Sequence, residues 1–302
     1  MAHRCYSREN GLGLLWLVTL GWAFSFSLIG VYLAGQVDDY ISVFVRVSLA
    51  LLLFAPLLMR ARLPPARALA LMAIGAVQIG LMYLALFRAY GHLGVPELLL
   101  FTIFTPLYVT LIDEVLIGRR HLPVVWWLAA LLAVVGAAVI RYDGLTATAL
   151  TGFFLVQAAN LCFAIGQVAY RRLALGAVVS QIQAFGYFFL GATLVAGLGM
   201  VLFADFDRAP ATVLQWSVLA WLGLGASGLG YLGWNLGARR VNTGQLAAMN
   251  NMLIPAGILV NYALWARDVD WLRLVIGGAV IAGAVWLAGR SMGGARRSTG
   301  KD

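Results

Sequence analysis

The pattern that most directly suggests covalent chemistry is a serine between glycines, GASG at 225–228. A serine nucleophile inside a membrane needs a histidine base from another segment. The histidines, His3, His92 and His121, all fall in expected tails or loops upstream of Ser227. We therefore expect Ser227 to be a packing residue. Metal-ligand clusters, Cys-x-x-Cys pairs and a Walker A loop are missing from the sequence, so we expect no enzyme, no metal and no cofactor.

Two ionisable residues, Arg46 and Glu97, fall inside apolar stretches, where a charge costs roughly 2.5–3.5 kcal/mol. Their similar expected depth predicts a structural ion pair between them. Alternatively, Arg46 snorkels to the headgroups and Glu97 caps the helix that starts at Pro96. If Glu97 faces a cavity, Phe101 and Tyr108 face it too, because they recur on its side at helical spacing. Such aromatic rings suit amphipathic or cationic substrates, although packing between helices explains them as well.

Several uncharged polar and aromatic side chains interrupt other apolar stretches. Amides such as Asn160, Gln167 and Asn250 avoid lipid and should face the interior of a helix bundle. Hydrogen bonding between helices would explain each amide singly, whereas together they favour a polar cavity. The candidate substrate-binding residues are Trp22, Tyr83, Glu97, Phe101, Tyr108, Asn160, Gln167, Tyr231, Trp234 and Asn250. Pro106 and Pro255 lie in the middle of their stretches and are candidate hinges for gating.

The elements that carry these residues are predicted membrane-spanning helices. The sequence is 62% hydrophobic and 11% charged, and its charges cluster between apolar runs of roughly 17–25 residues. This pattern predicts an all-α polytopic membrane protein with ten transmembrane helices. The expected spans are 12–33, 41–59, 69–88, 96–116, 123–140, 150–170, 180–203, 212–238, 244–265 and 271–289.

The positive charge fits membrane topology better than nucleic-acid binding. The net charge is +9, but the basic residues are dispersed and form no continuous patch. Of the 21 Lys and Arg residues, 15 fall in one set of alternate loops and tails. The positive-inside rule places that set, together with both termini, in the cytoplasm. The lipid bilayer is thus an expected partner, and nucleic acid is not.

The chain also repeats itself at about 140–150 residues. The stretch LLLFTIFTPLYVTLI around Pro106 aligns with LAAMNNMLIPAGILV around Pro255, and Gly80 and Tyr83 fall near Gly228 and Tyr231. Five spans in each half force the second half to insert upside down, as in many secondary transporters. We expect a first five-helix repeat at 1–145, an inverted second repeat at 146–290 and a basic cytoplasmic tail at 291–302.

Several stretches carry a family resemblance over about residues 12–290. Gly21-Trp22, FVRVSLALLLFAPLL, YLALFRAYGHLG and GYLGWNLGARRVNTGQLAAMNNMLIP resemble the EamA-type transporters of the drug/metabolite transporter superfamily. The resemblance implies two inverted five-helix repeats around a central cavity. It also implies an alternating-access secondary transporter in a bacterial inner membrane, often an exporter of amino acids or similar small metabolites.

We therefore expect a small-molecule substrate to bind near the midplane. A lipid-handling or non-transporting membrane partner protein is the alternative. The sequence leaves open the substrate, the direction of transport, coupling to protons and the oligomeric state.

Overall fold

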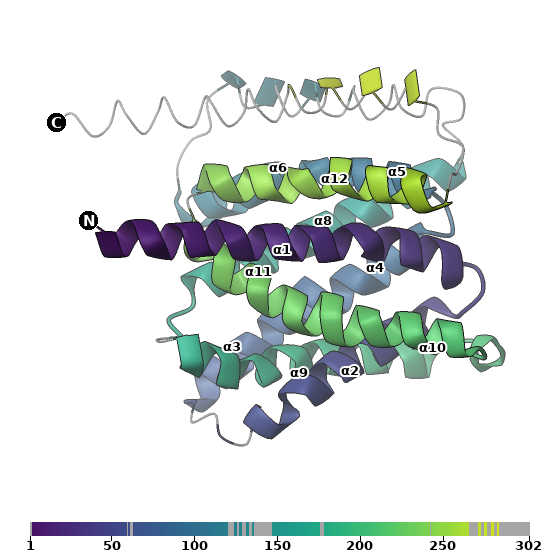
Figure 1. Cartoon of the computed structure of the whole chain (residues 1–302), viewed down its shortest axis with the longest axis horizontal. Helices are drawn as coiled ribbons and strands as arrows, with labels where there is room; N and C mark the ends of the chain where they lie inside the picture. The colour runs from purple at the N-terminus through teal and green to yellow at the C-terminus, as the bar shows by residue number, and fades with distance from the viewer. Residues whose placement is uncertain are drawn as a thin grey trace.

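The computed structural model describes residues 2–119, 147–175, 178–241 and 243–265, except 59, 61 and 62, together with scattered residues in 124–135 and 271–283. In these ranges the chain is helical, and short turns join the helices (Figure 1). The expected fifth and tenth spans and the tail at 291–302 lie largely or wholly outside the described residues.

The first half contains α1 (Ala2–Tyr32), α2 (Asp39–Leu58), α3 (Pro65–Gly75), η1 (Ala76–Leu81), α4 (Met82–Ala89), α5 (Val95–Phe101), η2 (Thr102–Phe104), α6 (Thr105–Thr110) and η3 (Leu111–Ile117). The second half contains α8 (Ala147–Arg172), α9 (Val178–Phe203), η4 (Phe206–Arg208), α10 (Val213–Ala220), η5 (Trp221–Leu229), α11 (Gly230–Ala238) and α12 (Thr243–Trp265). The segments η1, η3 and η5 are π-helical, whereas η2 and η4 are 3₁₀-helical.

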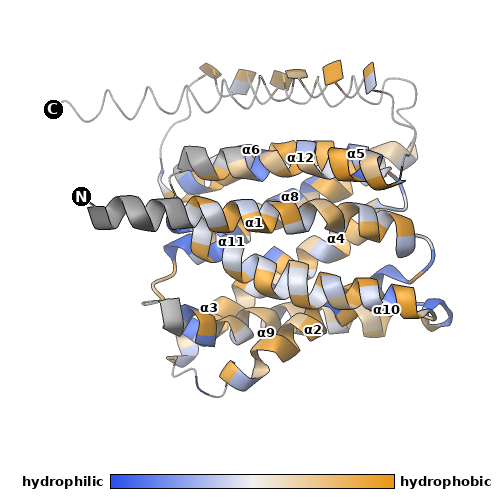
Figure 2. Cartoon of the chain, viewed as in Figure 1, coloured by the Kyte–Doolittle hydropathy of each residue, from blue (hydrophilic) through white to orange (hydrophobic). Residues whose placement is uncertain are grey.

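Seven helices in the described part of the chain are long and apolar enough to cross a membrane. They are Gly11–Tyr32, Asp39–Leu58, Pro65–Ala89, Val95–Ile117, Ala147–Arg172, Gln181–Phe203 and Val213–Ala238. They coincide with the expected spans one to four and six to eight, and α12 occupies the expected ninth span. Figure 2 shows hydrophobic residues along the helices and hydrophilic ones mainly in the end loops. The protein is therefore a multi-pass membrane protein.

The helices pack so that α1 and α8 have corresponding neighbours. Helix α1 packs against α11 and α12, and α8 packs against α4 and α6. Figure 1 shows α1 between the layer of α12, α5 and α6 and the layer of α10 and α11. Helices α2, α3 and α9 lie along the bottom of the bundle in the view of Figure 1, on the side away from α12. There α9 contacts both α2 and α3.

Glycine allows the backbones of α3 and α9 to touch. A Cβ atom at Gly75 would overlap the carbonyl oxygen of Phe188, and one at Gly191 would overlap that of Met72. Membrane helices gain packing energy from such close approach, because burial from lipid offers little hydrophobic driving force. The α3–α9 contact thus anchors the span that carries Met82 and Tyr83.

Candidate functional site

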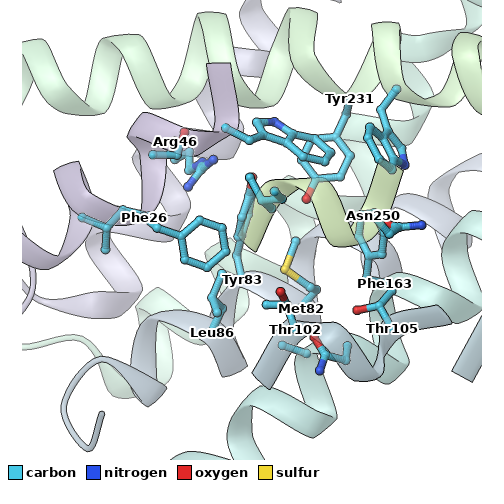
Figure 3. A pocket seen from close by; sticks show the side chains of 17 residues that line it. Phe26, Arg46, Met82, Tyr83, Leu86, Thr102, Thr105, Phe163, Tyr231 and Asn250 are labelled. Atoms are coloured by element: carbon cyan, nitrogen blue, oxygen red, sulfur yellow. The ribbon is translucent and has the colours of Figure 1, made fainter. Parts of the chain in front are cut away.

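A partly open pocket lies between helices from both halves of the chain. It contains about 730 Å³ of empty space, counted with the solvent at its open part. The lining residues are Trp22, Ser25, Phe26, Ile29, Arg46, Met82, Tyr83, Leu86, Thr102, Thr105, Ala159, Asn160, Phe163, Tyr231, Trp234, Asn250 and Leu253 (Figure 3).

Four aromatic rings form one wall of this pocket. The ring centroid of Trp22 lies 4.8 Å from that of Tyr231 and 5.0 Å from that of Trp234. Phe163 of α8 packs on the same group, 6.4 Å from Trp22. The Trp22 Nε1–H donates to the carbonyl of Ala226 at 2.7 Å, which ties α1 to the π-helical segment η5. Offset and tilted rings of this kind form a preorganised surface for a flat ligand.

Arg46 of α2 is buried beside the aromatic wall, with 2% of its surface exposed. Its Nε–H donates to Ser227 Oγ at 2.6 Å, and its guanidinium carbon lies 3.9 Å from the ring centroid of Tyr83. The hydroxyl groups of Tyr83 and Ser227 are 3.2 Å apart. These contacts fix the guanidinium, while its buried Nη1 has no hydrogen-bond partner. Ser227 therefore positions Arg46, in addition to the expected packing.

The expected ion pair between Arg46 and Glu97 is not formed in this structure. Glu97 lies in the first turn of α5, where its Oε2 accepts the N–H of Gly94 at 2.9 Å. This is the helix-capping role that the sequence offered as the alternative. Arg46 lies two turns into α2 and contacts Ser227, whereas Glu97 lies in the first turn of α5. The similar depth that the sequence suggested for the two charges is therefore not found.

A local interruption at Pro106 links the two halves of the chain. Proline has no N–H, so the Thr102 carbonyl loses its usual donor four residues on. The Thr105 N–H donates to Thr102 in the 3₁₀ pattern, although in a regular α-helix it would donate to Phe101. The Phe101 carbonyl, which starts this turn and accepts the N–H of Phe104, also accepts Nδ2 of Asn160 at 2.8 Å. The 3₁₀ turn before Pro106 thus presents a carbonyl that holds Asn160 beside the pocket.

Six of the ten residues expected to bind substrate line this pocket: Trp22, Tyr83, Asn160, Tyr231, Trp234 and Asn250. The other four lie elsewhere. Glu97 caps α5, and Phe101 contributes its carbonyl to Asn160 while its ring packs on Phe153 at 5.1 Å. The Tyr108 hydroxyl donates to Gln157 at 3.1 Å, and Gln167 is fully buried without a hydrogen-bond partner for its amide.

The sequence did not point to several lining residues. Thr102 and Thr105 are three positions apart just before Pro106, so helical spacing together with the proline could have indicated them. Met82 and Phe163 carried no comparable signal, because single apolar residues in an apolar span can face lipid, protein or cavity equally well.

A bundle of membrane-spanning helices with a partly open pocket between its two halves is the architecture of a small-molecule transporter. A model of the EamA-like transporter family matches residues 10–142. The biotin transporter of Salmonella typhimurium strain LT2 is 48% identical over 91% of this chain and 92% of its own length. The probable biotin transporter of Pseudomonas aeruginosa strain PAO1 is 49% identical over 90% and 96% of the two chains.

The biotin transporter of Escherichia coli strain K12 is 48% identical over 91% of this chain and 92% of its own. A solved structure described only as the crystal structure of a protein shares the fold, with a TM-score of 0.67 at 19% identity over 93% and 96% of the two chains. The chain therefore belongs to the EamA-type transporters of the drug/metabolite transporter superfamily. It is a membrane transporter and not an enzyme.

Proposed function

We propose that this protein carries biotin across the membrane through the central pocket. Relatives with nearly half of their residues identical over almost the whole chain are named biotin transporters. The observation that carries the proposal is the match between this ligand and the pocket, which combines aromatic rings with hydrogen-bonding amides and hydroxyls.

Biotin has a compact bicyclic head, made of a cyclic urea fused to a thioether ring. The apolar faces of that head suit the rings of Trp22, Tyr231 and Phe163. Its two urea N–H groups need acceptors. Asn160 and Asn250 each use Nδ2 as a donor to a backbone carbonyl, which leaves their Oδ1 atoms as acceptors for the ligand.

This proposal replaces amino acids as the expected substrate. The names of the relatives give no support to amino-acid export. The alternative, a lipid-handling or non-transporting partner protein, is not favoured either, because the matched relatives are named transporters. The transport assay described below measures in which direction biotin moves.

We further propose the ten-span inverted repeat, with residues 1–145 and 146–290 as its halves. The matching neighbours of α1 and α8 support it, as does the occurrence of π-helical segments in the expected third and eighth spans. The family model also covers about one such half. A bacterial inner-membrane location with both termini cytoplasmic belongs to this proposal. A topology reporter fused after Asp302 or inserted near Pro64 should be active only if it works in the cytoplasm.

Alternating access then corresponds to rocking of the two halves about the pocket. Pro106 interrupts its span through η2, and Pro255 lies inside α12, so both are suited to act as hinges. Coupling to protons is tested by imposing a pH gradient across the proteoliposome membrane and measuring the biotin flux. If transport is coupled to protons, a protonophore that collapses the gradient should lower this flux.

The function is tested with purified protein in proteoliposomes loaded on one side with radiolabelled biotin. We expect biotin flux above that of empty vesicles, and inhibition by excess unlabelled biotin. Asn250→Ala should lower this flux, because it removes a pocket amide. Asn251→Ala is the matched control, since the neighbouring amide on α12 does not line the pocket. Protein-dependent flux of amino acids without flux of biotin would refute the proposal.

A further inference from the structure

Among the described residues that line the pocket, Arg46 has the only charged side chain. It has no ion-pair partner in the part of the chain that the structure describes, and there its buried Nη1 makes no hydrogen bond. A buried charge without a counter-ion is expensive, and intramembrane arginines normally pair with an acid or mark a ligand pathway. The pocket thus contains a cation whose charge no described residue neutralises.

The contacts of Arg46 leave the edge of its guanidinium that carries Nη1, a buried atom, without a hydrogen-bond partner among the described residues. Ser227 takes the Nε–H, and the ring of Tyr83 covers one face of the group. An arginine fork binds a carboxylate with two parallel hydrogen bonds, which is both strong and directional. Tyr83 and Ser227 hold the Arg46 guanidinium in place before the ligand arrives, so little conformational entropy is lost on binding.

We infer that Arg46 binds the carboxylate of the transported molecule and that the pocket therefore selects a free monocarboxylic acid. The choice of biotin as that acid rests on the proposed function. Biotin carries one carboxylate at the end of an aliphatic chain, and this group is ionised near neutral pH. The bound anion supplies the missing counter-charge.

This assignment orients the ligand in the pocket. Figure 3 shows Arg46 on one side of the pocket and Thr102 and Thr105 on the opposite side, with Met82 between them. A carboxylate on Arg46 directs the aliphatic chain past Met82 toward the hydroxyl and amide groups. The bicyclic head then lies near Asn160 and the threonines, where its urea finds hydrogen-bonding partners.

Selection of a free acid has a chemical consequence. Biotin whose carboxyl group is esterified, or linked as an amide to lysine, has no negative charge for Arg46. Its binding leaves the guanidinium buried and uncompensated. The transporter should therefore reject conjugated biotin, whereas changes in the thioether ring that keep the acid should be tolerated.

The test is a binding titration of the purified wild-type protein in lipid nanodiscs with biotin, biotin methyl ester and desthiobiotin. Loss of a charge-assisted hydrogen bond predicts about 10- to 100-fold weaker binding of the ester than of biotin. Desthiobiotin, which keeps both the urea and the acid, should bind within a few-fold of biotin. Equal affinity for the ester and for biotin would overturn the inference while leaving biotin transport standing, whereas no binding of any of them would overturn the proposed function itself.

Variants give a second, independent measurement. Arg46→Gln should abolish the preference for acid over ester. Ser227→Ala should reduce this preference, because the Arg46 guanidinium loses the hydroxyl that positions it. Arg88→Gln is the matched control: Arg88 is exposed on α4 and does not line the pocket, so its substitution should leave the preference unchanged. An intact preference in folded Arg46→Gln protein would also refute the inference. If that variant fails to fold, the ligand series on the wild-type protein still decides.

Discussion

The link between Pro106 and Asn160 gives the sharpest test of how this fold is built. Replacing Asn160 by Leu keeps a similar volume but removes the donor that the Phe101 carbonyl uses at 2.8 Å. Asn160 is 4% exposed, so water does not readily replace the donor. The Phe101 carbonyl keeps the N–H of Phe104 in the 3₁₀ turn, so the variant loses one of its hydrogen bonds, which costs about 0.5–1.5 kcal/mol, a shift of roughly 2- to 13-fold in the unfolding equilibrium. Gln157 Nε2, at 3.5 Å from the same oxygen, is too distant to compensate fully.

The Phe101 carbonyl lies at the start of the 3₁₀ turn that directly precedes Pro106, and this predicts a specific rescue. Pro106→Ala restores an N–H for the Thr102 carbonyl, and the Thr105 N–H can then return to Phe101 in a regular α-helix. Asn160→Leu should therefore cost less in the Pro106→Ala background than in the wild-type background. The expected coupling is about 0.5–1.5 kcal/mol, within the range seen for residues that share one hydrogen-bond network.

The measurement is a double-mutant cycle of thermal or denaturant unfolding in one detergent, with the wild type, both single variants and the double variant compared. The reasoning is wrong if Asn160→Leu is equally destabilising in both backgrounds. Biotin flux of the Pro106→Ala variant in proteoliposomes supplies a second readout. Reduced flux in a variant of undiminished stability would support the proposed hinge role of Pro106.

Three further outcomes are expected. Gly191→Ala should destabilise the protein by about 1–3 kcal/mol in thermal unfolding, because the added Cβ meets the backbone of α3. Gly13→Ala is the control and should have little effect, because the space around Gly13 is open. Equal stability of the two variants would contradict the close packing. Asp113→Asn should lower the free energy of unfolding by at most about 1 kcal/mol in the same assay, since the ion pair of Asp113 with Arg172 at 2.6 Å is partly exposed. A much larger loss of stability would contradict its description as a surface contact. Biotin binding should be constant between about pH 6 and 8 and weaken toward the pKa of the ligand's own carboxyl group, roughly 4.3 for an alkyl acid, because Arg46 binds the ionised form of that group; a midpoint near neutral pH would point to another titrating group.

Much of the pocket was accessible to prediction because polar and aromatic residues are rare within membrane spans. An amide such as Asn160 or Asn250 cannot face lipid without cost, so its presence in an apolar run already indicates an interior position. Tyr231 was indicated by its match with Tyr83 in the other half, and Trp22 by one of the stretches that carry the family resemblance. Composition alone could not separate these residues from Gln167, which is equally polar but packed away from the pocket.

The predicted ion pair between Arg46 and Glu97 was wrong because position along the sequence does not reveal how each helix is rotated. Distance along each span estimates depth in the membrane, but an ion pair also requires that the two side chains point toward each other. That direction depends on the rotation of each helix about its axis, which packing against neighbours decides. The actual partner of Arg46, Ser227, is 181 positions away in a motif that the sequence could only interpret as packing.

The sequence by itself determined that this chain spans a membrane, because a continuous apolar run with charges at its ends has no other stable environment. It also indicated a duplicated architecture and an interior set of amides, since those signals are local. Only the tertiary structure decided that Arg46 faces the pocket without a counter-ion among the described residues, and that Asn160 donates to the Phe101 carbonyl in the turn before Pro106. Both facts depend on how helices rotate and cross, and those angles arise from the summed packing of residues far apart in the chain.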